Sequence, residues 1–173
     1  LPEILREAGY HTAGLHKSAL FSPDLGWGQG FDTWEVVAEL DAQSMARGNS
    51  AKELTDAAVS WLAAIGPEPF FLYLHYMDPS APYQAPDPWY DMFVPEENTS
   101  TLDGRASELG DLYHGASYTA EDVEKLVALY EGEIAYWDSE FIRIPEALQD
   151  QGLEESTVLV VMSDHGEQFA EHD

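Results

Sequence analysis

Two short apolar segments that end abruptly in polar residues constrain the fold of this chain most strongly. Residues 70–77 (FFLYLHYM) are apolar or aromatic with little alternation of polar residues, and residues 157–162 (TVLVVM) are rich in β-branched side chains. Apolar runs of this length without alternation are typical of strands covered on both faces, as in parallel sheets. The sequence therefore predicts two buried strands, of which the second runs directly into residues 163–167 (SDHGE).

Helical patterns alternate with these strands. An apolar stripe predicts a helix over residues 51–65, begun by Ser50. A longer helix is predicted from Thr119, where Asp122 completes a capping box, to about Gly152. Pro145 should kink it, because proline removes a helical hydrogen bond. The apolar face predicted for the long helix consists of Leu126, Leu129, Tyr130, Ile134, Trp137, Phe141 and Leu148. Shorter patterns predict the end of a helix over 1–9 and a strand over 10–15.

This alternation predicts an α/β fold with a mostly parallel or mixed central sheet and helices on both faces. We expect residues 1–173 to form part of one catalytic domain, in which 78–118 is a long, loop-rich segment and 18–48 is irregular. Loops of such length in compact domains are usually functional or disordered. Aromatic side chains of this segment either stack on a sugar ring or pack the loop onto the protein: Tyr83, Trp89, Tyr90, Phe93, Tyr113 and Tyr118.

The charge balance excludes one class of partner. The net charge is −26, from 33 acidic and 7 basic residues, so nucleic-acid binding through phosphate contacts is not expected. The acidity indicates either a well-solvated surface or adaptation to high salt. The chain contains no cysteine, which excludes disulfides, thiolate metal sites and a cysteine nucleophile within it. Its apolar runs are too short for a membrane span.

Asp164 and His165 are the first candidate site residues, because they follow a predicted strand and ligands bind at the carboxyl ends of strands. A carboxylate beside an imidazole indicates a metal site, and the alternative is a solvated turn. Two ligands do not complete a site, so others must come from elsewhere. Lys17 follows the 10–15 strand and is either an anion contact or a surface lysine. His75, near the end of the 70–77 strand, lies at the same sheet edge or is a core histidine bonded to a carbonyl.

Five motifs in order along the chain resemble the sulfatases of the alkaline-phosphatase-like superfamily. They are residues 5–12 (LREAGYHT), 30–32 (GFD), 70–83 (FFLYLHYMDPSAPY), 130–138 (YEGEIAYWD) and 163–172 (SDHGEQFAEH). The resemblance implies an alkaline-phosphatase-like core and hydrolysis of sulfate esters on a small molecule or glycan. It also implies a periplasmic or extracellular location.

The resemblance further implies a formylglycine nucleophile, made from cysteine or serine, beside a divalent cation that is usually calcium. Asp164 and His165 match two metal ligands, and the imidazole also suits manganese or zinc. Lys17 matches a lysine that binds sulfate. The nucleophile is expected to precede Leu1 and further parts to follow Asp173, so we expect an internal fragment that is inactive in isolation and binds metal weakly.

Ser80 departs from the family pattern, which usually has a histidine after Asp-Pro. Serine is neither a cation nor an acid at neutral pH. Two alternatives therefore stay open beside a sulfatase. One is a phosphodiester or phosphonate hydrolase, or a phosphoryl-group transferase, of the same superfamily. The other is a non-catalytic relative that keeps the fold as a binding module.

Overall fold

The computed structural model describes residues 1–37, 50–114 and 118–169. The chain divides into two compact units. Of the described residues, unit 1 contains 1–37, 50–77 and 139–157, and unit 2 contains 78–114, 118–138 and 158–169. Each unit has a hydrophobic core of its own. No helix in the described ranges has both the length and the apolar character that crossing a membrane requires.

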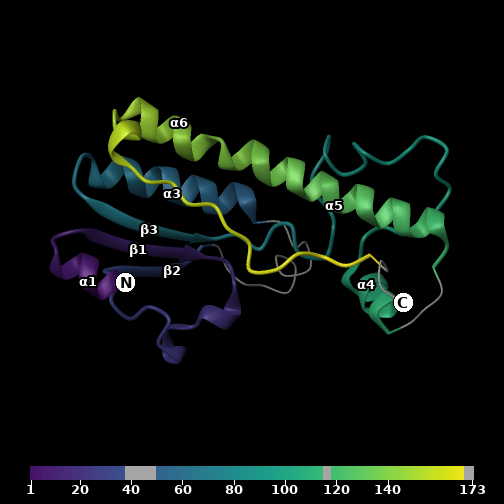
Figure 1. The fold of residues 1–173 in the computed structure, drawn as a ribbon, viewed down its shortest axis with the longest axis horizontal. Coiled ribbons are helices and arrows are strands. Elements are labelled where there is room, and N and C mark those ends of the chain that lie inside the picture. Colours follow the sequence, from purple (N-terminus) through teal and green to yellow (C-terminus); the bar gives the residue numbers. More distant parts are fainter. Residues whose placement is uncertain (38–49, 115–117, 170–173) are drawn as a thin grey trace. The chain divides into compact units, whose positions relative to one another are not determined.

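Unit 1 is built on a three-stranded parallel sheet in the order β2-β1-β3 (Figure 1). Its strands are β1 (His11–His16), β2 (Thr33–Val36) and β3 (Phe70–His75). The parallel sheet confirms the predicted α/β class, and β1 and β3 confirm two of the three predicted strands. β2 lies in the segment that was expected to be irregular. The smaller elements of this unit are α1 (Pro2–Glu7) and three 3-10 turns, at Ala19–Phe21, Pro23–Leu25 and Glu154–Ser156.

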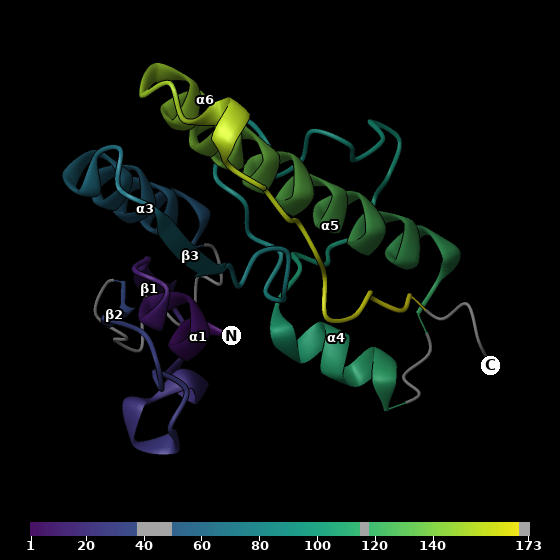
Figure 2. The ribbon, with the colours of Figure 1, turned by 60° about the vertical axis from the view of Figure 1, so that its left-hand side comes forward.

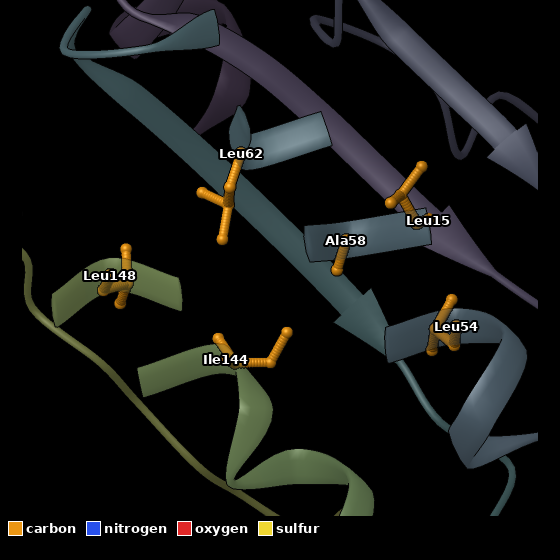
Figure 3. Close-up of a cluster of buried hydrophobic side chains, with 6 residues drawn as sticks. All are labelled: Leu15, Leu54, Ala58, Leu62, Ile144 and Leu148. Carbon is orange, nitrogen blue, oxygen red and sulfur yellow. The ribbon is translucent and has the colours of Figure 1, made fainter. Parts of the chain in front are cut away.

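Two helices, α3 (Ala51–Ile65) and α6 (Arg143–Asp150), contribute to the core on one side of this sheet. Leu15 of β1 and alternate residues of β3 face them, because side chains alternate along a strand. The fully or nearly buried members of this core are Leu15, Leu54, Ala58, Leu62, Ile144 and Leu148 (Figure 3). Gly66 ends α3 as expected, with a φ of 63° that favours glycine.

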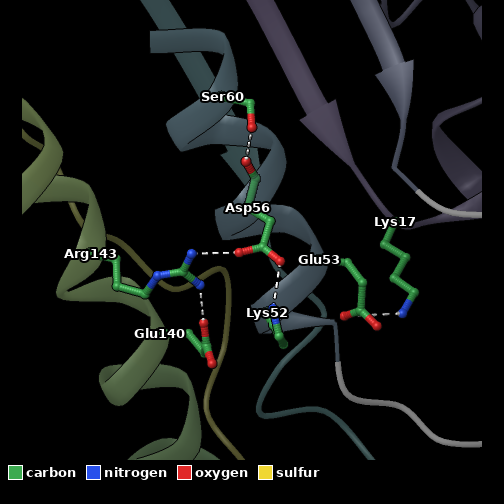
Figure 4. A network of polar contacts seen from close by, with 7 residues as sticks. All are labelled: Lys17, Lys52, Glu53, Asp56, Ser60, Glu140 and Arg143. Carbon is green, nitrogen blue, oxygen red and sulfur yellow. Dashed lines mark hydrogen bonds and ion pairs between the residues drawn. The ribbon is translucent and has the colours of Figure 1, made fainter. Parts of the chain in front are cut away.

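A polar cluster also connects α3 and α6. Asp56 accepts a hydrogen bond from Lys52 at 2.6 Å and another from Arg143, which also donates to Glu140 at 2.6 Å (Figure 4). The bond from Lys52, followed by that from Arg143, lowers the pKa of Asp56. Because these groups are substantially exposed, the cluster orients α6 more than it stabilises the fold.

Aromatic side chains cover the other face of the sheet. The rings of Phe31 and Phe71 stack 5.8 Å apart, and those of Trp34 and Tyr73 stack 6.2 Å apart. The Trp34 ring lies directly over Gly14, where a Cβ atom would approach it to 2.3 Å. Gly14 is therefore required by packing, because any larger residue would displace the indole.

Gly14→Ala should lower the free energy of unfolding of the full-length protein by about 1–3 kcal/mol, the usual cost of overpacking. Gly110→Ala is the matched control, since its added Cβ meets nothing within 4 Å and alanine favours the helix by about 0.5–1 kcal/mol. Urea unfolding measures both. Equal stability of the two variants would contradict the close packing at Gly14.

Unit 2 contains α4 (Ala106–Tyr113) and most of α5 (Ala120–Phe141) (Figure 2). The predicted capping box is confirmed: Asp122 N–H donates to Thr119 Oγ1 at 3.1 Å, and Thr119 N–H donates to Asp122 Oδ2 at 3.0 Å. α4 lies within the segment expected to be loop-rich. The predicted long helix is divided at Ile142, and Pro145 lies in the first turn of α6, where no helical hydrogen bond is lost.

The predicted apolar face of α5 is wrong in one position. Ile134 is 41% exposed, whereas Glu133 beside it is 1% exposed. The buried residues of α5 are Leu126, Ala128, Leu129, Gly132, Glu133 and Tyr136. The core of unit 2 therefore contains a carboxyl group where the pattern predicted an aliphatic side chain.

The predicted strand over 157–162 is also wrong. These residues form no strand, and Val158, Val160 and Met162 are 88%, 72% and 85% exposed. An isolated extended segment does not form a strand, because its backbone groups need a partner strand for their hydrogen bonds. Within the part of the chain that the structure describes, no segment supplies that partner.

Candidate functional site

The carboxyl ends of β1 and β3 bring two histidines together in unit 1. The parallel register pairs His16 with His75, so both side chains lie on the same face at the edge where ligands bind in open α/β sheets. Phe21 packs edge-on against both rings, with centroid distances of 5.6 Å to His16 and 4.5 Å to His75. His75 Nδ1 lies 2.9 Å from the Tyr73 hydroxyl, so a side chain is one partner of its ring.

His16 is fully buried at this edge. Its Nδ1 lies 3.1 Å from the Ser18 carbonyl oxygen, to which it must donate, because a carbonyl only accepts. Its Nε2 has no partner among the described residues. Burial above all, and also the neighbouring His75, lower the pKa of His16, so its imidazole stays neutral at physiological pH. The sequence indicated no role for His16, because the ring is buried by contacts with Phe21 and Trp34, which no local pattern predicts.

Lys17 follows His16 and is not an ordinary surface lysine. Its side chain is 8% exposed, and its Nζ lies 3.9 Å from Glu53 Oε2, at the start of α3 (Figure 4). A buried ammonium requires an anionic partner, and Glu53 is one such partner, in an ion pair that is longer than a hydrogen bond. The role of Lys17 in binding sulfate stays a prediction.

Asp164 and His165 lie in unit 2, on an exposed turn. His165 Nδ1 lies 2.8 Å from the Gly166 carbonyl oxygen and donates to it, so Nε2 is left as the ligand atom. This Nε2 lies 3.8 Å from Asp164 Oδ1, which also accepts the His165 backbone N–H at 3.1 Å. The Gly166 carbonyl, followed by the Asp164 carboxylate, raises the pKa of His165, so a metal ion at Nε2 would compete with a proton.

This pair has the chemistry of a metal site but not the full number of ligands. A carboxylate and an imidazole with a defined tautomer suit a divalent cation. In the described ranges of the chain, however, no three His, Asp or Glu side chains gather in a way that could hold a metal ion. Glu167, the next acidic residue along the chain, accepts a hydrogen bond from Tyr83 at 2.7 Å. Glu171 and His172 lie outside the described residues.

Tyr83 connects two segments that are 84 residues apart in sequence. Its side chain is fully buried and packs against Tyr130 and Phe169, at centroid distances of 5.4 and 6.1 Å. For Tyr83, the prediction that the aromatic residues of this segment pack the loop onto the protein is confirmed. The hydrogen bond from Tyr83 to Glu167 connects the turn that carries Asp164 and His165 to the 78–85 loop, within unit 2.

Glu133, in unit 2, is another residue that the sequence did not indicate. It is almost completely buried, and it accepts hydrogen bonds from the backbone N–H groups of Gln84 and Ala85. Burial above all, and then Asp78, raise the pKa of Glu133 to about 8. A signal was present, because Glu133 lies four residues after Leu129 and seven after Leu126, in phase with the apolar face.

Comparison with known proteins places these observations in one family. The model of the Sulfatase family matches residues 1–173. A protein named "Sulfatase" from Formosa agariphila is 22% identical over 214 aligned positions, which cover 99% of this chain and 42% of the relative. The "Multifunctional alkaline phosphatase superfamily protein PehA" from Trinickia caryophylli is 26% identical over 140, covering 68% of this chain and 27% of the relative.

An arylsulfatase from Clostridium perfringens is 26% identical over 113 residues and covers 61% of this chain and 24% of the relative. Among solved structures, a phosphonate monoester hydrolase from Agrobacterium radiobacter matches with a TM-score of 0.62 and 18% identity, covering 90% of this chain and 44% of that one. This similarity shows the fold alone. The chain spans between 24% and 42% of the length of these curated relatives. The predicted alkaline-phosphatase-like core is confirmed, and the chain belongs to the sulfatase family.

Proposed function

We propose that the full-length protein containing this chain is a metal-dependent hydrolase of sulfate esters. The observation that carries the proposal is the Asp164–His165 pair, in which the bond from Nδ1 to Gly166 presents Nε2 beside a carboxylate. Membership of the sulfatase family supports a hydrolase, and relatives named sulfatase and arylsulfatase support sulfate esters as substrates. The proposed substrate is a sulfated small molecule or glycan.

In this proposal, Asp164 and His165 hold a divalent cation together with ligands from outside the described residues. Calcium is the usual ion of the family, and an imidazole ligand also suits manganese or zinc. A bound cation would stabilise negative charge on the transferred group as a Lewis acid. A formylglycine nucleophile, expected upstream of Leu1, belongs to the same proposal.

Three further residues, Lys17 and His16 in unit 1 and Ser80 in unit 2, are each proposed to have a supporting role within their own unit. Lys17 is held in a buried position at the end of β1, in an ion pair with Glu53. In this proposal its ammonium group donates a charge-assisted hydrogen bond to a sulfate oxygen. His16 is neutral and buried against Phe21 and Trp34, so it adds no charge. Ser80 carries no charge, so it binds by hydrogen bonds and does not act as a cation.

A second candidate is hydrolysis of phosphodiesters or phosphonate monoesters. The relative named multifunctional alkaline phosphatase superfamily protein supports it, as does the Asp-His pair, which suits phosphoryl transfer as well as sulfuryl transfer. A third candidate, a non-catalytic binding module, is favoured by Ser80 in place of a histidine.

Steady-state hydrolysis by the full-length protein, supplied with Ca²⁺, Mn²⁺ or Zn²⁺, distinguishes the three candidates. We expect kcat/KM for p-nitrophenyl sulfate to exceed that for p-nitrophenyl phenylphosphonate and bis(p-nitrophenyl) phosphate by about tenfold or more. An enzyme discriminates between substrates by how tightly it binds their transition states, which here differ in the charge and shape of the transferred group. The reverse order would favour the second candidate. Absence of turnover with all three substrates and all three ions would favour the binding module.

A further inference from the structure

The carboxyl group of Glu133 lies in the interior of unit 2, where a charged group is costly. Its contacts are to the loop that follows β3: the backbone N–H groups of Gln84 and Ala85 donate to it, and Asp78 is the charged group that acts on it. Its Oε1 atom has no hydrogen-bond partner among the described residues. An unpaired buried oxygen destabilises the fold, so packing alone does not account for a glutamate at this position.

Several contacts hold residues 78–85 and their continuation against α5 and the adjoining chain. Gly132, beside Glu133, lets the Trp89 carbonyl oxygen approach so closely that an added Cβ would lie 2.4 Å from it. Tyr83 N–H donates to the Gly104 carbonyl at 2.8 Å. Figure 2 shows this part of the chain passing beside α5. The loop is therefore held at its backbone, and Glu133 supplies part of the polar attachment.

The loop in turn reaches the turn that carries Asp164 and His165. Tyr83 lies directly before Gln84, and its hydroxyl donates to Glu167, two residues after His165. Phe169 packs against both Tyr83 and Tyr130 of α5. A continuous set of contacts therefore runs from Glu133 through Gln84 and Tyr83 to the 163–167 segment, all of it within unit 2.

Glu133 can hold the loop beside Asp78 because it is uncharged at neutral pH. Burial and the Asp78 carboxylate both raise its pKa, and the neutral carboxyl still accepts from backbone N–H groups through its carbonyl oxygen. A glutamine has the same shape and neutrality. An alanine leaves two backbone N–H groups without this partner.

We propose that Glu133 is a positioning residue, which holds the 78–85 loop and, through Tyr83, the 163–167 segment in the arrangement that the candidate metal site needs. The inference rests on the proposed function as far as the metal is concerned. The coupling between Glu133 and the two segments does not depend on it.

Hydrogen exchange of the full-length protein tests the coupling without any need for activity. We expect Glu133→Ala to increase amide exchange in peptides covering both 78–85 and 163–167, and Glu133→Gln to leave both close to wild type. Glu131→Gln is the control, since Glu131 is exposed on the same helix. Unchanged exchange in the alanine variant, or an increase confined to 78–85, would overturn the proposal.

A pH series of thermal unfolding provides a second readout, which tests whether Glu133 is uncharged at neutral pH, as the proposal requires. The pKa of Glu133 rises from an ordinary value of 4.5 to about 8 in the folded protein. Between these values the unfolded chain releases the proton and the folded chain keeps it, so stability falls as pH rises through this window. The Tm of wild type should therefore fall relative to that of Glu133→Gln from pH 5 to pH 8. A constant difference would overturn the proposal.

Hydrolysis and metal binding separate failure of this proposal from failure of the proposed function. If Glu133 positions the site, Glu133→Ala should weaken binding of Mn²⁺ by about 10–100-fold, as loss of supporting groups around metal ligands does, and Glu133→Gln should restore it. If Glu133→Ala increases exchange in both segments but the wild-type protein hydrolyses no ester, only the proposed function is refuted. Full Mn²⁺ affinity in the alanine variant would refute only the role of Glu133.

Discussion

Replacing Asp164 or His165 by alanine in the full-length protein is expected to lower kcat/KM for p-nitrophenyl sulfate by about three orders of magnitude. A metal ion that stabilises charge in the transition state contributes several kcal/mol, and each 1.36 kcal/mol corresponds to a factor of about ten in rate. The two side chains lie side by side on one turn, so they should act as a unit. The double variant should therefore be little worse than either single variant.

The control for this experiment is Glu155→Gln. Glu155 is an exposed carboxylate in the 3-10 turn that precedes the 157–162 segment in sequence, so its replacement removes one negative charge without altering the proposed ligands. Its kcat/KM should equal that of wild type. A loss of less than tenfold for both Asp164→Ala and His165→Ala would contradict their role as metal ligands.

Tyr83→Ala should lower the free energy of unfolding by about 3–5 kcal/mol, the usual cost of removing a large buried aromatic side chain. The variant loses contacts with Tyr130 and Phe169 as well as the hydrogen bond to Glu167. Tyr83→Phe should cost less, about 1.5–3 kcal/mol, because only a hydrogen bond to a charged group is removed. Chemical denaturation of the full-length protein measures both.

Phe93→Ala is the matched control, since Phe93 lies in the same segment and is 45% exposed. Exposed substitutions of this kind usually change stability by about 0.5 kcal/mol or less. The two interpretations of the aromatic residues differ in outcome for Tyr83. A side chain that stacks on a sugar would raise KM on removal and leave stability unchanged, and that result would contradict the packing role.

The elements that the sequence predicted correctly are those with strong local signals. β3 is a continuous run of apolar residues, α3 has a regular apolar stripe, and α5 begins at a capping box. β2 was missed because four residues beside several glycines carry little periodicity. The prediction of a strand over 157–162 was wrong for a different reason. The composition of this segment favours a strand, but a strand forms only beside a partner strand, and composition does not reveal whether one is present.

The candidate site was predictable only where neighbours in sequence are neighbours in space. Asp164 and His165 are adjacent in sequence, and Lys17 was a candidate because it follows a predicted strand. The bond between Tyr83 and Glu167 joins residues 84 positions apart, which no local pattern encodes. Glu133 had a local signal, its phase with Leu126 and Leu129, but the aliphatic Ile134 gave a competing one. The structure decides between them, because Glu133 alone is buried.

Calorimetric titration of Ca²⁺ and Mn²⁺ into the metal-stripped full-length protein tests the proposed metal site most directly. Wild type should bind one divalent ion per chain, and Asp164→Ala and His165→Ala should each weaken that binding by about tenfold or more. Glu155→Gln should bind as wild type does. Equal affinity of wild type and both ligand variants would show that Asp164 and His165 hold no metal, and the proposed mechanism would then be wrong.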